Sequence, residues 1–455
     1  MAIGNMRQLW KWCGIMLDIF AVSLVLFVVN EWFMPHEVPC LCYLAGMLLT
    51  VMVLYVFDVC NAMYSYTVQR KRQPLTLAVG LGLSAVVLSA VLLITRHGMA
   101  WVGIVWGIFA ACFLVLLVCR CSMLTVFLSI LGAQTLLVLY DENADQTVLY
   151  PLLYRAVDYG TLRTHAIAEG AFDEIKAEMR RADSIVLLGD IPHDIADASI
   201  VLAKCLAKPL YVAPAFADIC RMNSKLTHIG DVLVLAMENK RKQQFQMAVK
   251  RLFDIFASAA ALVILSPFFA VIALAIKMDT GGSVFYKQER YTIHKQRFDI
   301  LKFRTMVEGA EKDGARLAAK HDSRITRSGR ILRRFRLDEL PQLINILRGE
   351  MSIVGPRPER PAFADEYSVT VDNYDLRYQM KAGLTGFAQV YGGYTIQASD
   401  KALLDWIYIN RFSLWLDVKL IIQTFMVLFI KEASMGVAEE DMPFSAGENQ
   451  ELSMK

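Results

Sequence analysis

The chain has 455 residues, of which 56% are hydrophobic, and its mean hydropathy is +0.40. This apolar content exceeds that of a typical soluble domain and indicates a membrane protein. The formal net charge is only +3, and we expect no nucleic-acid partner.

The apolar residues are concentrated near the N-terminus. Four segments there are each about long enough to span a bilayer, at residues 12–29, 41–57, 75–94 and 99–118. Lys or Arg residues precede the first segment, separate the second from the third and follow the fourth at Arg120, whereas the first spacer has none. The positive-inside rule therefore predicts a four-helix transmembrane domain at 1–120, with the N-terminus and everything after Arg120 in the cytoplasm. We expect the first segment to be a span and not a removed signal peptide, because it is too long and has no convincing cleavage site.

The next region, 121–239, is predicted to form a small α/β domain. Its apolar start at 124–140 fits either a fifth span or a buried strand and helix start, and we favour the second because a fifth crossing would place the rest of the chain outside the cell. Beyond it, helix-period segments and short β-rich runs alternate along the chain, at 171–181, 184–188, 195–207, 210–212 and 232–235. This alternation is typical of a parallel, Rossmann-like sheet. Because no GxGxxG motif is present, we interpret the domain as a spacer or regulatory domain without a bound cofactor.

Cysteine and histidine usage excludes several mechanisms. All nine cysteines lie at or before Cys220, and of the seven histidines only His294 and His321 lie beyond residue 250. We interpret both histidines as surface residues. Thiol catalysis and a cysteine-type zinc site are therefore excluded in the C-terminal half, and carboxylate chemistry remains.

A further hydrophobic element at 250–277 opens the C-terminal half. Lys250 and Arg251 begin it, and Ser266-Pro267 falls near its centre, where proline removes a backbone hydrogen bond and kinks a helix. Hydropathy alone favours a kinked fifth transmembrane helix. Cations at both ends, and the arginine-rich region that follows, argue against a crossing.

The last apolar segment, 412–431, carries the charged residues Asp417 and Lys419. We interpret it as a helix that lies in the membrane interface instead of spanning the bilayer. The tail at 432–455 is polar and is predicted to be disordered.

The most informative motif is a pair of adjacent acids, Asp338 and Glu339. Adjacent carboxylates repel one another unless a metal or cations neutralise them. Suitable cations precede the pair at helical spacing, at Arg327, Arg330, Arg333 and Arg334. Pro341 suits the first turn of a helix and Gly349 its end, so Asp338 is expected at or just before a helix N-terminus. Such a place suits a phosphate, although a solvated basic helix followed by a capped helix would give the same pattern.

This region resembles the bacterial sugar transferases, the polyprenyl-phosphate hexose-1-phosphate transferases that start capsule, O-antigen and exopolysaccharide assembly. The matching blocks are 337–343 (LDELPQL), 351–352 and 354–359 (VGPRPE). Further matches are Gln288, Glu289, Arg290, Phe298, 302–306 (KFRTM), 381–386, 388–390, 404–405 and 408–410. Two places depart from the family: glycines of a hairpin turn are replaced by residues 291–295, and Gly392-Gly393 stands where many relatives carry an arginine. Arg357 or Arg377 would then have to supply that charge.

The resemblance implies the long form of the family. Its parts would be the four-helix domain, a degenerate nucleotide-fold domain at 121–239, and a monotopic catalytic domain at 247–431. In that last domain 250–277 would form a re-entrant hairpin, with Lys250 and Arg251 at the cytoplasmic face and a break at Ser266-Pro267. The protein would lie in the bacterial inner membrane, in contact with membrane lipid, with its catalytic domain facing the cytoplasm.

The resemblance also implies a reaction. A hexose-1-phosphate would pass from a UDP-sugar to undecaprenyl phosphate, with Asp338 as nucleophile and UMP as the first product. Asp338 and Glu339 would bind Mg²⁺, which suits a ligand set of oxygens. Phosphate oxygens would be bound by Lys302, Arg304, Arg333, Arg357, Gln389 and Asp405. Two alternatives are a lipid-phosphate glycosyltransferase that releases UDP and a non-catalytic membrane scaffold, against which the adjacent acids argue. The sugar is not identified, and a homodimer stays an alternative to a monomer.

Overall fold

The structure is a computed structural model of the chain. It describes residues 12–20, 99–131, 134–141, 160–167, 172–189, 191–214, 216–222, 224–229, 231–237, 243–307, 324–392 and 397–429, together with single positions or short pieces between 22 and 89 and at 309 and 322. The described residues up to Pro214 form one compact unit, and those from Phe216 onward form another.

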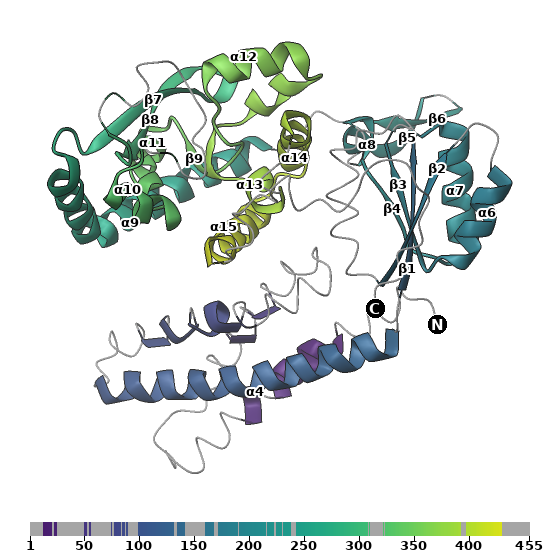
Figure 1. The fold of residues 1–455 in the computed structure, drawn as a ribbon, viewed down its shortest axis with the longest axis horizontal. Helices are drawn as coiled ribbons and strands as arrows, with labels where there is room; N and C mark the ends of the chain where they lie inside the picture. Colours follow the sequence, from purple (N-terminus) through teal and green to yellow (C-terminus); the bar gives the residue numbers. More distant parts are fainter. Residues whose placement is uncertain are drawn as a thin grey trace. The chain divides into compact units, whose positions relative to one another are not determined.

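The first unit contains a long apolar helix, α4 (Met99–Leu131), drawn in blue in Figure 1. Its stretch Val102–Val126 is apolar and long enough to cross a membrane. Buried side chains from all four predicted spans share one core with it, among them Val22, Leu54 and Leu77. Much of the first three predicted spans lies outside the described residues.

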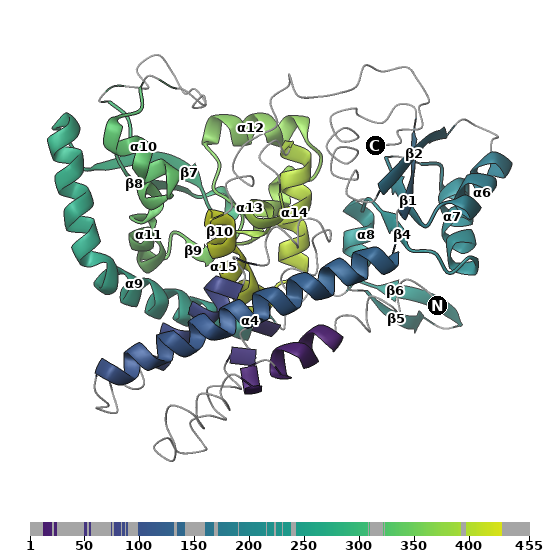
Figure 2. The same ribbon diagram turned by 60° about the horizontal axis from the view of Figure 1, so that its bottom comes forward.

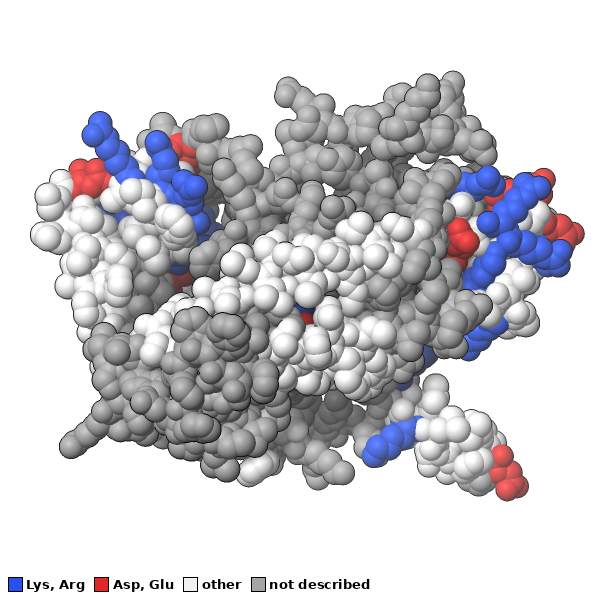
Figure 3. Space-filling view, turned by 90° about the horizontal axis from the view of Figure 1, so that it is seen from below, with Lys and Arg blue, Asp and Glu red and all other residues white. Residues whose placement is uncertain are grey.

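Arg120 does not flank a helix end, as the charge pattern had predicted, because α4 continues to Leu131. Its side chain is buried, and Nε donates a hydrogen bond of 2.9 Å to Oδ1 of Asp18 in the first predicted span. The ion pair lets an arginine lie within an apolar helix, since its charge is compensated inside the protein. The described surface of α4 accordingly carries no exposed charge, and it forms the white central band of Figure 3.

The rest of the first unit is a four-stranded parallel sheet in the order β2-β1-β3-β4. The strands are β1 (Gln134–Asp141), β2 (Gly160–Ile167), β3 (Ser184–Leu188) and β4 (Leu210–Val212). Helices α6 (Phe172–Arg181) and α7 (His193–Cys205) cover one face of this sheet (Figure 1). The predicted parallel α/β arrangement is therefore present. The apolar residues 124–140 form the end of α4 and strand β1, so the expected strand is confirmed but the expected helix start is wrong.

One predicted strand belongs elsewhere. Residues 232–235 lie in β6 (Val232–Ala236), which pairs antiparallel with β5 (Lys225–Ile229) and not with the parallel sheet. This hairpin and the short helix α8 (Phe216–Arg221) are part of the second unit. The alternation of β-rich and helical segments cannot reveal which strands pair, because pairing depends on contacts distant in sequence.

Beyond this hairpin, the described part of the second unit contains two more strand pairs, surrounded by helices. The 38-residue helix α9 (Gln243–Thr280) comes first, followed by the antiparallel pair β7 (Phe285–Tyr291) and β8 (Arg297–Phe303). Next come α10 (Arg327–Arg334), the 3₁₀ turn η3 (Leu337–Glu339), α11 (Gln342–Arg348), β9 (Ser352–Val354) and α12 (Pro361–Thr370). The last are η4 (Tyr374–Gln379), β10 (Gly383–Thr385), α13 (Phe387–Tyr391), α14 (Ala398–Asn410) and α15 (Leu414–Phe429). Strand β10 pairs parallel with β9.

Helix α9 is bent but continuous, and Figure 2 shows the bend clearly. The break expected at Ser266-Pro267 is therefore wrong: the chain does not reverse there as a helical hairpin. A proline removes one backbone hydrogen bond and kinks a helix, while the turns on either side persist. The Ser266 hydroxyl donates a hydrogen bond of 2.8 Å to the carbonyl of Val263 beside it.

Both ends of α9 nevertheless pack on the same domain. Near its start, Arg251 donates to the carbonyl oxygens of Ile346 and Leu347 at the C-terminus of α11, the second bond measuring 2.8 Å. At its end, Asp279 accepts hydrogen bonds of 2.8 and 2.7 Å from the backbone N–H and hydroxyl of Ser328 in α10. The bend thus lets one long apolar helix follow the surface of the domain.

The outward face of α9 is apolar and exposed, with Phe256, Val263 and Ile264 more than 70% accessible. The sequence predicted that Lys250 anchors this helix at the membrane surface, but Lys250 does not lie at the outer surface. It is buried and forms an ion pair with Asp417 of α15. The carboxylate of Asp417 also accepts a hydrogen bond of 2.7 Å from the hydroxyl of Tyr408.

Candidate functional site

The β7–β8 hairpin forms one wall of the site. Its register places Tyr286 opposite Lys302 and Gln288 opposite Ile300, so residues at even positions along the hairpin share one face. The turn lacks the glycines of the resembling family, yet its backbone adopts the conformation that glycine favours, with φ of 55° at both His294 and Lys295. The substituted turn therefore closes the hairpin without glycine.

Lys295 contributes contacts that a glycine could not make. Its Nζ donates a hydrogen bond of 2.9 Å to the Ser368 hydroxyl and lies 2.9 Å from a carboxylate oxygen of Asp375. These contacts offset the strain of a left-handed conformation in a residue with a side chain.

The acidic pair lies on η3, between the basic helix α10 and helix α11. Arg336, just before it, has a φ of 52°, an uncommon value for a residue other than glycine that redirects the chain sharply. The N-cap of α11 is Pro341, so Asp338 precedes the helix start, as predicted, and Gly349 ends the helix with a φ of 89°, also as predicted.

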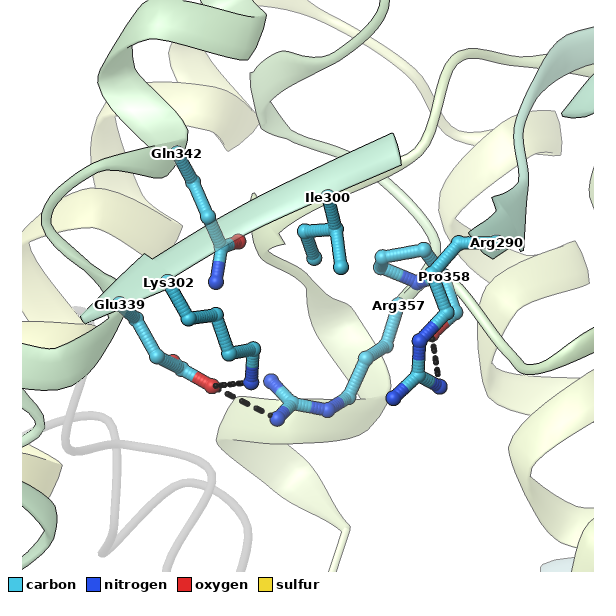
Figure 4. A pocket seen from close by; sticks show the side chains of 7 residues that line it. All are labelled: Arg290, Ile300, Lys302, Glu339, Gln342, Arg357 and Pro358. Atoms are coloured by element: carbon cyan, nitrogen blue, oxygen red, sulfur yellow. Dashed lines mark hydrogen bonds and ion pairs between the residues drawn. The ribbon is translucent and has the colours of Figure 1, made fainter. Parts of the chain in front are cut away.

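Glu339 is neutralised by two cations. Its Oε1 accepts hydrogen bonds from Lys302 Nζ at 3.1 Å and from Arg357 Nη2 at 2.9 Å (Figure 4). Burial by itself would raise the pKa of Glu339, but the charges of Arg357, Lys302 and Arg336 outweigh it, and the pKa lies well below its usual range. Glu339 is therefore an ionised, fixed group.

The pKa of Asp338 is shifted in the opposite direction. Burial and the neighbouring Glu339 charge raise the pKa of Asp338, and the charges of Lys302 and Arg333 lower it by less. Among the described residues, no side chain makes a hydrogen bond or ion pair with its carboxylate. Of the two adjacent acids, Glu339 is therefore paired with described cations and Asp338 is not.

An open pocket lies next to Glu339. It is lined by Arg290, Ile300, Lys302, Glu339, Gln342, Arg357 and Pro358 (Figure 4). The three basic side chains converge on it from two elements, the β7–β8 hairpin and the loop after β9. Burial, together with the nearby Arg357 and Arg360 charges, lowers the pKa of Arg290 to about 10 despite the opposing effect of Glu359. An anion in this pocket would relieve the crowding of positive charge.

Two polar residues of this lining match the family but were not assigned to the phosphate site from the sequence. Arg290 could have been found from the alternation of the hairpin, since it lies on the same face as Lys302 once the strands are paired in register. Gln342 lies inside the acidic motif, but its type alone gives no sign that it faces a pocket.

Several residues expected to bind phosphate lie elsewhere. Arg304 donates a hydrogen bond of 2.9 Å to the Thr280 hydroxyl and another to the carbonyl of Gly281, so it holds the end of α9. Gln389 donates to the carbonyl of Leu384 at 3.1 Å. Neither lines the pocket.

Arg333 occupies an intermediate position. Its Nε donates a hydrogen bond of 2.8 Å to the Thr305 hydroxyl, and its charge acts on Asp338. It does not line the pocket, but it remains near the acidic pair.

Asp405 is also placed away from the pocket. Its Oδ2 lies 2.7 Å from Arg377 Nη2, and both side chains are only 1% exposed. Arg377 therefore lies in the core and does not replace the arginine that many relatives carry at the position of Gly392-Gly393. Arg357 lines the pocket and can supply that charge. Gly393 itself lies outside the described residues.

The glycines around the pocket serve close backbone packing. A Cβ atom at Gly383 would lie 2.1 Å from the backbone nitrogen of Gly355, far inside van der Waals contact. The loops that carry these two glycines can therefore approach each other only without side chains. This approach fixes the segment that presents Arg357.

The part of the chain that carries the site is similar to known proteins. A family model described as "Bacterial sugar transferase" matches residues 245–431. A UDP-N-acetylgalactosamine-undecaprenyl-phosphate N-acetylgalactosaminephosphotransferase of Aeromonas hydrophila is 39% identical over 280 residues, covering 60% of this chain and 63% of the relative. A UDP-glucose:undecaprenyl-phosphate glucose-1-phosphate transferase of Caulobacter vibrioides is 41% identical over 180 residues, covering 38% of this chain and 67% of the relative. An exopolysaccharide production protein, PSS, of Rhizobium leguminosarum bv. phaseoli is 40% identical over 187 residues, covering 39% of this chain and 94% of the relative. The chain thus spans less than two thirds of the length of the Aeromonas relative and nearly all of the Rhizobium relative.

Proposed function

The chain belongs to the bacterial sugar transferase family, and from this premise we propose that it transfers a sugar-1-phosphate from a UDP-sugar to undecaprenyl phosphate and releases UMP. The observation that carries the proposal is the division between the two acids: Glu339 is held by Lys302 and Arg357, whereas Asp338 lies beside them with no described side-chain partner. The relatives differ in the sugar that their names give, so the proposal extends to the sugar-1-phosphate class.

Asp338 is the nucleophile in this proposal. Its carboxylate oxygen attacks the phosphorus that bears the sugar, a new oxygen–phosphorus bond forms, and the bond to the UMP oxygen breaks. UMP leaves with the bonding electron pair. A phosphate oxygen of undecaprenyl phosphate then attacks the same phosphorus, which restores the Asp338 carboxylate and gives a lipid diphosphate-linked sugar.

The basic residues of the pocket stabilise the phosphate oxygens. Lys302 and Arg357 already point at one carboxylate oxygen, so they occupy fixed positions before a substrate arrives. Arg290, at the other side of the pocket, is placed to bind a second phosphate of the same diphosphate.

Mg²⁺ is the proposed cofactor, and the acidic pair fits it. Among the described residues no group of three or more His, Cys, Asp or Glu side chains forms a metal site, but Mg²⁺ commonly takes only one or two carboxylates together with water and substrate phosphates. Asp338 and Glu339 would hold it, and a cation beside Asp338 would offset the repulsion of its carboxylate by Glu339. When bound, the ion neutralises part of the diphosphate charge.

Helix α9 supports a membrane arrangement with both ends on one side. Its two ends bind the same domain through Arg251 and Asp279, and its outward face is apolar. We propose that this face lies in the cytoplasmic leaflet, where a soluble donor and a lipid acceptor can meet at the pocket. We also propose that the N-terminal region spans the bacterial inner membrane four times, and that the parallel sheet is a Rossmann-like domain without a cofactor.

The test uses the purified full-length protein with single UDP-sugars, undecaprenyl phosphate and Mg²⁺, and it measures UMP and UDP separately. Wild type is expected to release UMP, and without lipid acceptor to release about one UMP per protein molecule as the covalent intermediate accumulates. Asp338→Asn should abolish both, whereas the matched control Asp299→Asn, an exposed acid on β8, should retain them. UDP release would instead favour a glycosyltransferase, and UMP release that persists in Asp338→Asn would refute the nucleophile.

A further inference from the structure

The segment Pro356–Pro358, which carries Arg357, is held by hydrogen bonds to its carbonyl groups. Pro356 and Pro358 have no backbone N–H, so this segment has few donors of its own and is fixed through its carbonyl groups. The carbonyl of Pro356 accepts a hydrogen bond of 2.8 Å from the backbone of Gly383. The carbonyl of Pro358 accepts one of 3.2 Å from the side chain of Arg290.

The carbonyl of Arg357 itself is bound by a buried arginine. Nη2 of Arg377 donates a hydrogen bond of 2.9 Å to it. The same guanidinium lies 2.7 Å from Asp405 on α14 and 4.9 Å from the ring centre of Tyr374. Nη1 of Arg377 also donates to the Tyr374 hydroxyl.

Neither member of this ion pair can touch a substrate, because each side chain is only 1% exposed. Among the described residues, the hydrogen bond that links them to the pocket goes to the backbone of Arg357, whose guanidinium donates to Glu339. A buried ion pair is a costly way to hold a fold, since desolvation opposes much of the attraction between its charges. Its place directly behind a pocket residue therefore points to a role in geometry.

We propose that Arg377 and Asp405 are positioning residues, which fix the Arg357 backbone so that its guanidinium meets Glu339 and the substrate phosphate. The proposal rests on the function proposed above. Asp405 orients the Arg377 fork, and Arg377 holds the Arg357 carbonyl. The two residues act on the reaction only through Arg357.

A double-mutant cycle on the full-length protein tests this. Asp405→Asn should lower kcat/KM for UMP release about tenfold to a hundredfold, the scale expected when a phosphate-binding group is displaced by about 1 Å. In an Arg357→Ala background the same substitution should change kcat/KM less than about twofold, because the group it positions is gone. Equal factors in both backgrounds would overturn the proposal and leave a general structural role.

Two further measurements keep the test decisive. If Asp405→Asn does not fold, the paired replacement Arg377→Met with Asp405→Leu removes both buried charges together and should fold while still losing the activity. Hydrogen exchange of the peptide that contains residues 354–360 measures how firmly this backbone is held, and it does not depend on enzyme activity. The exchange rate of this peptide should rise in the variants, while that of peptides from α9 should not change. Unchanged exchange in 354–360 would contradict the positioning, whereas a wild type that releases no UMP would contradict only the proposed function.

Discussion

Neutralising each of the two adjacent acids should change stability in opposite directions. Glu339→Gln replaces a carboxylate that accepts from Lys302 and Arg357 by a neutral amide. A hydrogen bond to a charged group is worth roughly twice a neutral one, so each contact should lose about 1 kcal/mol. The Arg357 side chain is 42% exposed, which reduces its share. The expected loss is about 1–2 kcal/mol.

Asp338→Asn should stabilise the protein at neutral pH. Burial and the Glu339 charge raise the pKa of Asp338, so its ionised form is less favourable in the folded than in the unfolded chain. The free energy of unfolding therefore falls as pH rises through the folded-state pKa of Asp338. The contribution of this carboxyl to stability is fully present below its unfolded-state pKa. The advantage of Asp338→Asn should be largest near neutral pH and should vanish below the ordinary aspartate pKa of about 3.9.

The assay is the apparent Tm of detergent-solubilised protein as a function of pH. Glu339→Gln should lower the Tm by roughly 2–8 °C at neutral pH for a unit of this size, Asp338→Asn should raise it, and the exposed control Asp299→Asn should leave it unchanged. If Asp338→Asn lowers the Tm as much as Glu339→Gln, Asp338 has a compensating partner and the division of roles between the acids is wrong.

Three other substitutions test parts of the fold by the same Tm measurement. His294→Gly should stabilise the protein by about 0.5–1 kcal/mol, because His294 is exposed and has a φ of 55°; a loss of stability would contradict the left-handed turn. Gly383→Ala should destabilise by more than about 3 kcal/mol, since its Cβ would lie 2.1 Å from a backbone nitrogen. Gly107→Ala in α4 should be tolerated, because an added Cβ there has no neighbour within 4 Å among the described residues. Lys250→Met should lose about 3–5 kcal/mol by leaving Asp417 buried and unpaired, and adding Asp417→Leu should restore most of it; equal loss in both variants would argue against the ion pair.

Much of the local structure follows from sequence patterns. The alternating runs predicted the parallel sheet, Gly349 predicted the end of α11, and the charge pattern placed Asp338 and Glu339 beside a basic helix. Such features depend on neighbours within a few residues, which determine periodicity, helix ends and turns.

The sequence could not show which polar residues of the family motif line the pocket and which lie in the core. Arg304 and Asp405 have the residue types of phosphate-binding or substrate groups, yet one holds the end of α9 and the other pairs with Arg377. Arg120 ended a predicted span because its charge interrupts an apolar run, whereas Asp18 neutralises it from 102 residues away in sequence. Each case depends on a partner distant in sequence, and no local pattern carries that information.

The pairing of the two adjacent acids also depends on partners distant in sequence. The sequence did not show which of the two acids pairs with the nearby lysine and arginine side chains, and either carboxylate could have been neutralised by them. In the structure, Lys302 and Arg357 both donate to one oxygen of Glu339, so these cations are held in place, and no described side chain makes a hydrogen bond or ion pair with Asp338. A diphosphate must then compete with Glu339 for the same two donors. We therefore expect Glu339→Gln to bind UDP more tightly than wild type while reacting more slowly, and weaker binding would show that Glu339 positions these donors more than it competes for them.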